Sequence, residues 1–412
     1  MRSPPRRLTH KPGIQVEIAV NETLSRGRTS GVVSLTSYRL RRILTSQDRR
    51  KFIKFPWKIY AKDPHWIPPQ VSRQKKLLDE RHNPFLRDQS ETCFFLLEKG
   101  TEVVGRIVAI DNFRYRDLYK EKTGFFGFFE CIEDYTAAEC LLSAARDWLN
   151  QRGLDRMIGP TNFTTNDESG LLIEGFDSPP SLAIPYTHRV YPAFFERFGL
   201  TKLKDVLAWA LDLTRPMPER MQRIASRIES RGSFQIRPVN LEVYEKEKEA
   251  LKEVFLSSSF QGYGELPWTE EEYYAVADEF RPLTIPDLFL IVEEHGKPMA
   301  LCFSLPDYGP ILSAMRGPFA FIKAMRFKQL SRSIHRLRGF SFQLHRSYQG
   351  RGIETFLYNE MARTAKRLGY RESIILALEN YHINRHIREL GGNVEKRLRL
   401  YQYPAETSSQ TE

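Results

Sequence analysis

Apolar and polar residues alternate in a way that divides the chain into a polar N-terminal segment and two α/β regions. Residues 1 to about 34 are polar and basic and lack a regular apolar period, so we predict a disordered tail there. Residues 49–60 have helical spacing, and Pro56 predicts that this helix ends and resumes. An extended segment with three prolines follows at residues 64–69.

The first α/β region is predicted from apolar runs separated by turn residues. Residues 93–98 and 103–110 flank a Lys-Gly turn, which is typical of a β-hairpin. Residues 124–130 form a third strand, and residues 136–152 carry apolar positions at the i, i+3, i+4 spacing of a helix. The remaining elements predicted for this region are a strand at 157–158, a helix over 191–198 and a strand over 206–213.

The second region begins after a polar stretch at residues 214–218, where two prolines mark a domain boundary. Its predicted elements, in order, are a linker helix (219–231), a strand (234–237), a helix (243–255), a hairpin (288–293 and 299–305), a strand (340–345), a helix (353–368), a strand (373–379), a helix (381–390) and a strand (394–403). Both regions share the order helix, hairpin, strand, helix, strand, short helix, strand. We therefore expect two copies of one α/β unit with a mixed sheet.

The predicted boundaries follow from these elements. They are a tail (1–34), a first unit (35–213), a linker helix (214–233), a second unit (234–405) and a short tail (406–412).

Composition narrows the class of protein. The 412 residues are 41% hydrophobic and 27% charged, which excludes disorder throughout and collagen-like chains. No stretch approaches the ~20 apolar residues of a membrane helix, and the basic N-terminus lacks the apolar core of a secretory signal. Four scattered cysteines are too few for a disulfide framework or a zinc cluster, so we expect reduced thiols in a cytoplasmic protein.

The net charge of +11 is unevenly distributed. Residues 1–50 contain eleven Lys/Arg and three acidic residues, a net of +8, which leaves +3 for the rest of the chain. Residues 308–353 contain nine basic residues and no acidic one. A local basic field of this kind suits a phosphate-bearing small molecule at least as well as a nucleic acid, so we expect no specific nucleic-acid partner.

The most informative segment joins the strand at 340–345 to the following helix. Gly350 and Gly352 allow the backbone to turn its N–H groups inward, and the helix N-terminus adds a positive end. Arg346 and Arg351 add cationic groups, so the loop can hold a pyrophosphate. It lacks the Lys-Ser/Thr pair of a Walker loop, and Thr355 breaks the G-x-G-x-x-G dinucleotide pattern.

This segment resembles the GNAT superfamily of acyl-CoA-dependent N-acyltransferases. Gln349, Gly350 and Gly352 match its Q/R-x-x-G-x-G/A signature, and Asn380 and Gly391 match the later Asn and Gly. The resemblance implies a GNAT fold, an acyl-CoA co-substrate and no metal. The residues it implies for acyl-CoA binding are Leu344 (through its backbone N–H, which polarises the thioester), Gln349, Gly350, Arg351, Gly352, Ile353, Glu354 and Asn380.

Catalytic groups are less clear, because the sequence departs from the family pattern. Glu354 replaces the last small residue of the signature, and Ile387 stands where many members carry a general-acid Tyr. The strand at 340–345 contains no carboxylate that could serve as base. Glu379 and His382, at the predicted strand-to-helix junction, are the candidates for proton transfer.

The first unit is predicted to be a degenerate GNAT unit that binds no CoA, because Glu133 and Asp134 follow its third strand and would repel phosphates. Residues 55–57, 124–130, 166–172 and 391–392 together resemble a group of uncharacterised bacterial tandem-GNAT proteins.

Four further segments have open interpretations. Residues 166–170 bind substrate or form a polar turn, and Tyr186, His188 and Tyr191 line a pocket or pack in a core. His382 and His386 have a metal-ligand spacing but no evident third ligand. Residues 319–337 form a core-facing helix, lie on an anionic membrane, or shield the CoA 3′-phosphate.

The function predicted from these features is transfer of an acetyl or other acyl group from CoA to an amine on a small molecule or peptide, by direct attack on the thioester. One alternative is a Fem-like transferase that uses aminoacyl-tRNA. The other is a CoA-binding or scaffold protein without catalysis.

Overall fold

A computed structural model gives the fold, and it describes residues 38–258, 265–314, 330–381 and 383–404. The tails predicted at 1–34 and 406–412 lie outside this part of the chain. The elements of the first half are β1 (Tyr38–Arg42), α1 (Ser46–Ile59), α2 (Val71–Leu77), β2 (Ser90–Lys99), β3 (Glu102–Asn112), α3 (Phe113–Tyr119), β4 (Thr123–Cys131), α4 (Tyr135–Asn150), β5 (Arg156–Gly159), β6 (Leu171–Glu174), α5 (Tyr191–Phe198) and β7 (Thr201–Asp212).

The second half repeats this order, apart from β6, with a helix in front. Its elements are α6 (Glu219–Arg231), β8 (Phe234–Pro238), α7 (Tyr244–Ser258), α8 (Glu270–Phe280), β9 (Phe289–Glu294), β10 (Lys297–Pro306), α9 (Gly309–Ala314), β11 (Arg336–Leu344), α12 (Ile353–Arg367), β12 (Glu372–Leu378), α13 (Ile383–Glu389) and β13 (Asn393–Tyr403). None of the described helices is long and apolar enough to cross a membrane.

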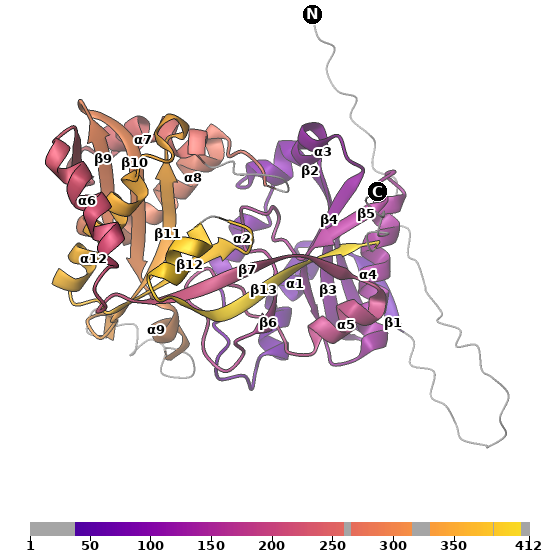
Figure 1. The fold of residues 1–412 in the computed structure, drawn as a ribbon. Helices are drawn as coiled ribbons and strands as arrows, with labels where there is room; N and C mark the ends of the chain where they lie inside the picture. The colour runs from indigo at the N-terminus through magenta and orange to yellow at the C-terminus, as the bar shows by residue number, and fades with distance from the viewer. Residues whose placement is uncertain (1–37, 259–264, 315–329, 382, 405–412) are drawn as a thin grey trace, which may run out of the picture.

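All of these strands belong to one mixed sheet, and the two halves exchange strands at its centre. The order along the sheet is β1-β2-β3-β4-β5-β13-β7-β12-β11-β10-β9-β8, with β6 paired to β13. The last strand of the second half therefore lies between β5 and β7 of the first half, and β7 lies between β13 and β12 (Figure 1). This confirms the α/β class and the repeated unit, while the exchange makes the halves parts of one continuous sheet.

The expected break in the first helix does not occur. Pro56 lies inside α1, where it cannot donate the hydrogen bond that Phe52 O would otherwise accept. The buried guanidinium of Arg106 supplies that bond instead, with Nη1 2.8 Å from Phe52 O. The helix therefore continues through the proline to Ile59.

The core forms on both faces of the sheet in each half. In the first half, α4 and α5 cover one face and α1 covers the other. In the second half, α12 covers one face of β9–β11 and α7 covers the opposite face. Phe125, Phe126, Phe128 and Phe129 of β4 divide between the two faces of their sheet, so one strand supplies both cores of the first half.

Candidate functional site

The parallel strands β11 and β12 separate from each other before either strand ends. Their pairing stops at Gly339 and Ile375, whereas β11 continues to Leu344 and β12 to Leu378. In the described sheet the only neighbours of β11 are β10 and β12. Beyond Gly339, one edge of β11 therefore has no strand partner.

A bulge in β11 marks the point where the strands separate. Ser304 of β10 is paired with Gly339 and Phe303 with Ser341, which leaves Phe340 as an extra residue. A bulge of this kind bends a strand and ends regular pairing. It directs the last residues of β11 away from β12.

The backbone N–H of Leu344, which the resemblance implies for thioester polarisation, lies at this unpaired edge. His345 N–H donates to Met299 O of β10 at 2.8 Å. Because successive N–H groups along a strand point to opposite sides, Leu344 N–H points toward the unpaired edge. A backbone donor there is suited to polarise a carbonyl oxygen placed between the strands.

The glycine loop opens α12 as expected. Gly350 and Gly352 have φ values of 75° and 83°, a conformation that favours glycine, and Gly352 is the N-cap of α12. No side chain caps this helix, so its first turn can offer backbone N–H groups to an anion. Ile353 is buried, and Glu354 lies in the first turn.

The two glycines have different surroundings. A Cβ atom at Gly352 would lie 2.7 Å from Ile224 and 3.2 Å from Ile228, both of α6. A Cβ atom at Gly350 would meet nothing within 4 Å. Gly352 is therefore required for packing against α6, and the open side of the loop is at Gly350.

The cations of the loop are exposed. The Arg351 guanidinium lies 4.8 Å from the centre of the Tyr348 ring, and Tyr348 Oη donates to Glu294 at 2.8 Å. Arg346 and Gln349 are also exposed. These side chains are free to approach a phosphate.

The carboxylate of Glu379 is held by the first half. Oε1 accepts a hydrogen bond from Asp205 N at 3.0 Å, and Oε2 lies 2.7 Å from Lys202 Nζ. These contacts tie the end of β12 to β7, which favours a positioning role. His382, the other catalytic candidate, lies outside the described residues, and His386, four residues later, lies 3.9 Å from Glu389.

Two asparagines near the end of β12 have different roles. Asn380, which the sequence predicts to bind acyl-CoA, is exposed. Asn384 is buried, and its Nδ2 donates to Leu378 O at 2.6 Å and to Tyr381 O at 3.0 Å. Trp209 Nε1 donates to Asn384 Oδ1 at 2.7 Å, so Asn384 fixes the turn between β12 and α13.

Tyr381 is a candidate that sequence analysis missed. Its hydroxyl group is buried and has no hydrogen-bond partner among the described residues. Buried tyrosine hydroxyls are usually hydrogen-bonded, which makes this one notable at the end of β12. The sequence signal was its position directly after Asn380.

Aromatic side chains cover the face of the sheet opposite α12. The ring centre of Phe280 in α8 lies 4.9 Å from that of Phe340 and 5.6 Å from that of Phe303, which is 5.1 Å from that of Phe289. The Arg338 guanidinium stacks 4.7 Å from the Phe340 ring centre. The bulge of β11 therefore faces an apolar surface.

Comparison of the sequence with known proteins assigns this chain to a family. A scan against models of protein families gives no match. Protein YghO of Escherichia coli is 32% identical over 302 residues, which cover 71% of this chain and 76% of YghO. This chain belongs to the YghO family.

A second relative and two solved structures extend the comparison. The bacterial ceramide synthase of Caulobacter vibrioides is 29% identical over 369 residues, covering 87% of this chain and 96% of the relative. A tandem GNAT protein from the clavulanic acid biosynthesis pathway has a TM-score of 0.50 at 11% identity and covers 89% of this chain and 98% of its own. The glucosamine N-acetyltransferase region of a fungal β-N-acetylglucosaminidase has a TM-score of 0.51 at 12% identity, covering 91% of this chain and 39% of that chain. The fold of this YghO-family protein is the tandem GNAT fold.

In the first GNAT unit, the segment after β5 occupies the space between β4 and β5 where these strands separate. Pairing of these strands stops at Phe125 and Ile158, and Thr161 N then donates to Phe126 O at 2.8 Å. Asn162 Oδ1 accepts a hydrogen bond from Phe128 N at 2.9 Å, at the bulge of β4. Residues 161–163 therefore occupy the space between these strands in the first unit.

The acidic pair at Glu133 and Asp134 also makes structural contacts. Asp134 caps α4 by accepting a hydrogen bond from Thr136 N at 2.8 Å, and it accepts a second from Tyr38 Oη at 2.5 Å. Glu133 lies 3.3 Å from His188 Nε2. Both acidic residues thus have partners within their own unit.

The aromatic segment around Tyr191 belongs to a buried polar cluster. Tyr60 and Tyr191 donate hydrogen bonds to Glu130 Oε2 at 2.9 and 2.8 Å. Burial raises the pKa of Glu130 to about 7, although the nearby Arg106 opposes this shift. His188 lies beside both tyrosine rings, at 6.4 and 5.6 Å between centres. The cluster anchors the α1 side of β4, as the core interpretation expected.

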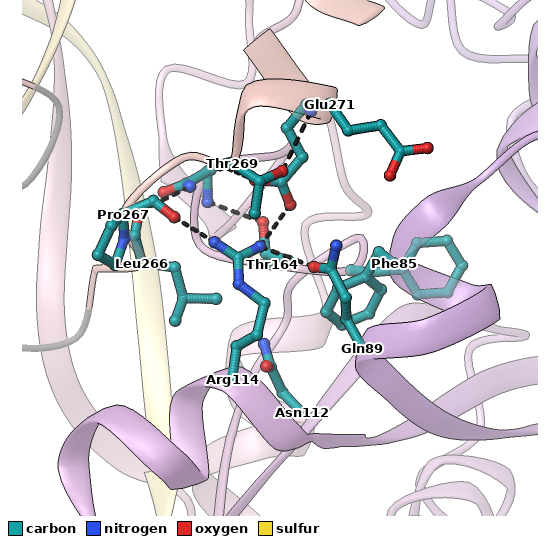
Figure 2. A network of polar contacts seen from close by, with 12 residues as sticks. Phe85, Gln89, Asn112, Arg114, Thr164, Leu266, Pro267, Thr269 and Glu271 are labelled. Carbon is teal, nitrogen blue, oxygen red and sulfur yellow. Dashed lines mark hydrogen bonds and ion pairs between the residues drawn. The ribbon is translucent and has the colours of Figure 1, made fainter. Parts of the chain in front are cut away.

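The first unit also holds a segment of the second, as Figure 2 shows. Arg114 Nη1 lies 2.6 Å from Glu272 Oε1 of α8, and Nη2 donates to Pro267 O. Asn166 Nδ2 donates to Leu266 O at 2.9 Å, and Leu266 packs in the core of the first unit. The polar loop at 166–170 therefore contacts the segment that leads into α8.

Proposed function

We propose that this YghO-family protein is an acyl-CoA-dependent N-acyltransferase, with acyl-CoA bound by the second GNAT unit and a long-chain amine as acceptor. The observation that carries the proposal is the separation of β11 from β12 next to the N-terminus of α12. This helix begins at Gly352 and has no side-chain cap. The separation supplies a path for an extended thioester arm, and the helix N-terminus supplies donors for its pyrophosphate.

The proposed step is direct attack of the amine nitrogen on the thioester carbonyl. The C–N bond forms, the C–S bond breaks, the electron pair leaves on the CoA sulfur, and the amine nitrogen gives its proton to water. Leu344 N–H stabilises the oxyanion, and the hydroxyl of Tyr381 gives a proton to the thiolate and regains one from water, so that free CoA leaves as the thiol. Glu379 contributes by fixing the end of β12, since its carboxylate is held by Lys202 and Asp205.

The acceptor class is inferred from two independent supports. The relative from Caulobacter vibrioides is named a ceramide synthase, and a ceramide is the amide of a long-chain amino alcohol. The aromatic surface of Phe280, Phe303 and Phe340 beside the bulge suits the alkyl chain of such an acceptor.

The test is formation of an amide in vitro. The purified chain is incubated with palmitoyl-CoA and a sphingoid base, and the products are followed by mass spectrometry together with thiol release. We expect equal amounts of N-acyl product and free CoA. If neither the N-acyl product nor free CoA forms, the result supports the scaffold alternative. If an acyl group is transferred only from aminoacyl-tRNA, the result supports the Fem-like alternative.

The proposed acid is tested by Tyr381→Phe, which removes only the hydroxyl group. We expect a fall in kcat of about 10²-fold or more with unchanged acyl-CoA affinity. Tyr135→Phe, on α4 in the first unit, is the matched control and should retain wild-type kcat. Wild-type kcat in Tyr381→Phe would remove this residue from the mechanism.

A further inference from the structure

Helix α6 carries a stripe of arginines that the acyl transfer does not use. Arg220, Arg223, Arg227 and Arg231 are separated by three, four and four residues, so they lie on one flank of the helix. At 1.5 Å per residue, the stripe is about 16 Å long. Figure 1 places α6 at the outer side of the second half, away from the first.

All four guanidinium groups face solvent. Each of these arginines is exposed, and within the described part of the chain none of the four makes an ion pair or a side-chain hydrogen bond. Of the two acidic residues of α6, Glu229 lies on the side of the helix opposite the stripe, whereas Glu219 stands four residues before Arg223 and borders the stripe at its N-terminal end. From Arg223 to Arg231 the stripe is thus a surface of one charge sign.

The apolar face of α6 packs beside the glycine loop and so places the stripe near that loop. Met221, Ala225 and Ile228 are buried, and Ile224 and Ile228 are the residues that a side chain at Gly352 would meet. Ile224 is the apolar residue nearest to the stripe around the helix. Further exposed cations on the loop and on α12 are Arg346, Arg351, Lys366 and Arg367.

We infer that this arginine stripe docks the protein on an anionic lipid surface and brings the glycine loop of α12 close to it. The inference rests on the proposed function, since a long-chain acyl-CoA and a long-chain amine both partition into membranes. Each basic side chain near an anionic lipid surface raises binding about fivefold. Single-stranded nucleic-acid sites place aromatic rings among their cations, and α6 contains no aromatic residue, so a lipid surface is favoured.

The test compares two charge reversals in the full-length chain. Arg223→Glu/Arg227→Glu changes the stripe, and Arg50→Glu/Lys54→Glu changes two exposed cations with the same spacing on α1. Binding is measured by co-sedimentation with phosphatidylcholine vesicles, with and without phosphatidylglycerol. We expect wild type and the α1 variant to bind only the anionic vesicles, and the α6 variant to bind them at least about 25-fold more weakly.

Two further readouts separate this inference from the proposed function. Affinity for acetyl-CoA, measured by calorimetry without vesicles, should be the same in all three proteins. Loss of acetyl-CoA affinity in the α6 variant, with vesicle binding retained, would assign the stripe to CoA phosphates and overturn the inference. Equal vesicle binding by both variants, or tighter binding of wild type to a single-stranded oligonucleotide than to anionic vesicles, would also overturn it.

Discussion

Gly350 and Gly352 share a left-handed backbone, but only Gly350 faces open space, so it gives the cleaner test of the glycine loop. Gly350→Asp places a negative charge beside the predicted pyrophosphate without a clash. We expect acyl-CoA affinity, measured by calorimetry, to fall about tenfold or more.

Gly153→Asp is the matched control, since Gly153 has the same φ of 75° and also meets nothing within 4 Å. It lies in the first unit, after α4, and should leave the affinity unchanged. Equal affinities in the two variants would remove the glycine loop from the acyl-CoA site.

The buried carboxyl of Glu130 predicts a pH dependence of stability. Its pKa is about 7 in the folded protein and about 4.3 in an unfolded chain, so the folded state holds the proton more tightly. This contribution to stability is complete below about pH 4 and is lost as pH rises to about 7. Between pH 5 and pH 8 the loss amounts to about 2–3 kcal/mol of unfolding free energy.

Glu130→Gln removes the titrating group while keeping an acceptor for Tyr60 and Tyr191. Relative to this variant, wild type should lose that 2–3 kcal/mol in denaturant titrations between pH 5 and pH 8. The exposed Glu133→Gln serves as control and should follow wild type. Parallel pH curves for wild type and Glu130→Gln would show that the carboxyl does not titrate as described.

At the residue scale, the sequence predicted the local conformation of residues better than it predicted their tertiary contacts. Gly350, Gly352 and Leu344 were assigned to a loop and a strand end that the structure confirms, because these assignments depend on local conformation. The partners of Glu379 and the burial of Asn384 depend on β7, which is distant in sequence. No local pattern indicates such contacts.

At the scale of elements, the contact between α3 and α8 has a predicted consequence for catalysis. Arg114 holds Glu272 and Pro267 at the start of α8 (Figure 2). Phe280, at the other end of α8, contacts the bulge at Phe340. Arg114→Ala should therefore raise the KM for the amine several-fold and leave the affinity for acyl-CoA unchanged.

The control for this element is Arg116→Ala on the same helix, because Arg116 pairs with Asp111 inside the first unit. Arg114→Lys should recover part of the effect, since it restores one charge but not the fork of the guanidinium. A KM that is unchanged in Arg114→Ala would show that α8 does not position the acceptor.

Most elements were predictable because their apolar periods are clear, and α5, α6 and α12 begin within one residue of the predicted positions. The exception at Pro56 arises from a tertiary contact, since Arg106 replaces the missing backbone donor. β1, β6, α2, α3, α8 and α9 were not predicted. The first two are strands of only five and four residues, too short for a distinct apolar pattern.

At the scale of the whole molecule, strand exchange predicts that neither half is stable alone. β7 pairs with β12 from Asp212 to Val206 and with β13 from Ala210 to Thr201, so a cut at the exposed Pro216 separates β7 from both partners. Residues 35–215 and 216–412, expressed separately, should be insoluble or unfolded by circular dichroism.

The same two fragments, expressed together, should form a one-to-one complex that binds acyl-CoA. Size-exclusion chromatography with mass determination checks this outcome. A soluble fragment 216–412 that binds acyl-CoA alone would show that the exchange is dispensable for the second unit.

The repeated order of elements was sufficient to predict two copies of one α/β unit. It was not sufficient to predict the exchange, because a strand has the same apolar pattern whichever neighbour it pairs with. The domain boundary at residues 213–214 stays a prediction. Strands from both sides of this boundary pair with each other in the one sheet.

The location of the acyl group tests the central claim most directly. A photoreactive fatty acyl-CoA is cross-linked to the full-length chain, and the labelled peptides are mapped by mass spectrometry. We predict labels in residues 336–344 and on α8, at the surface formed by Phe280 and Phe340. Labels confined to β4 and to residues 156–170 of the first unit would contradict the account.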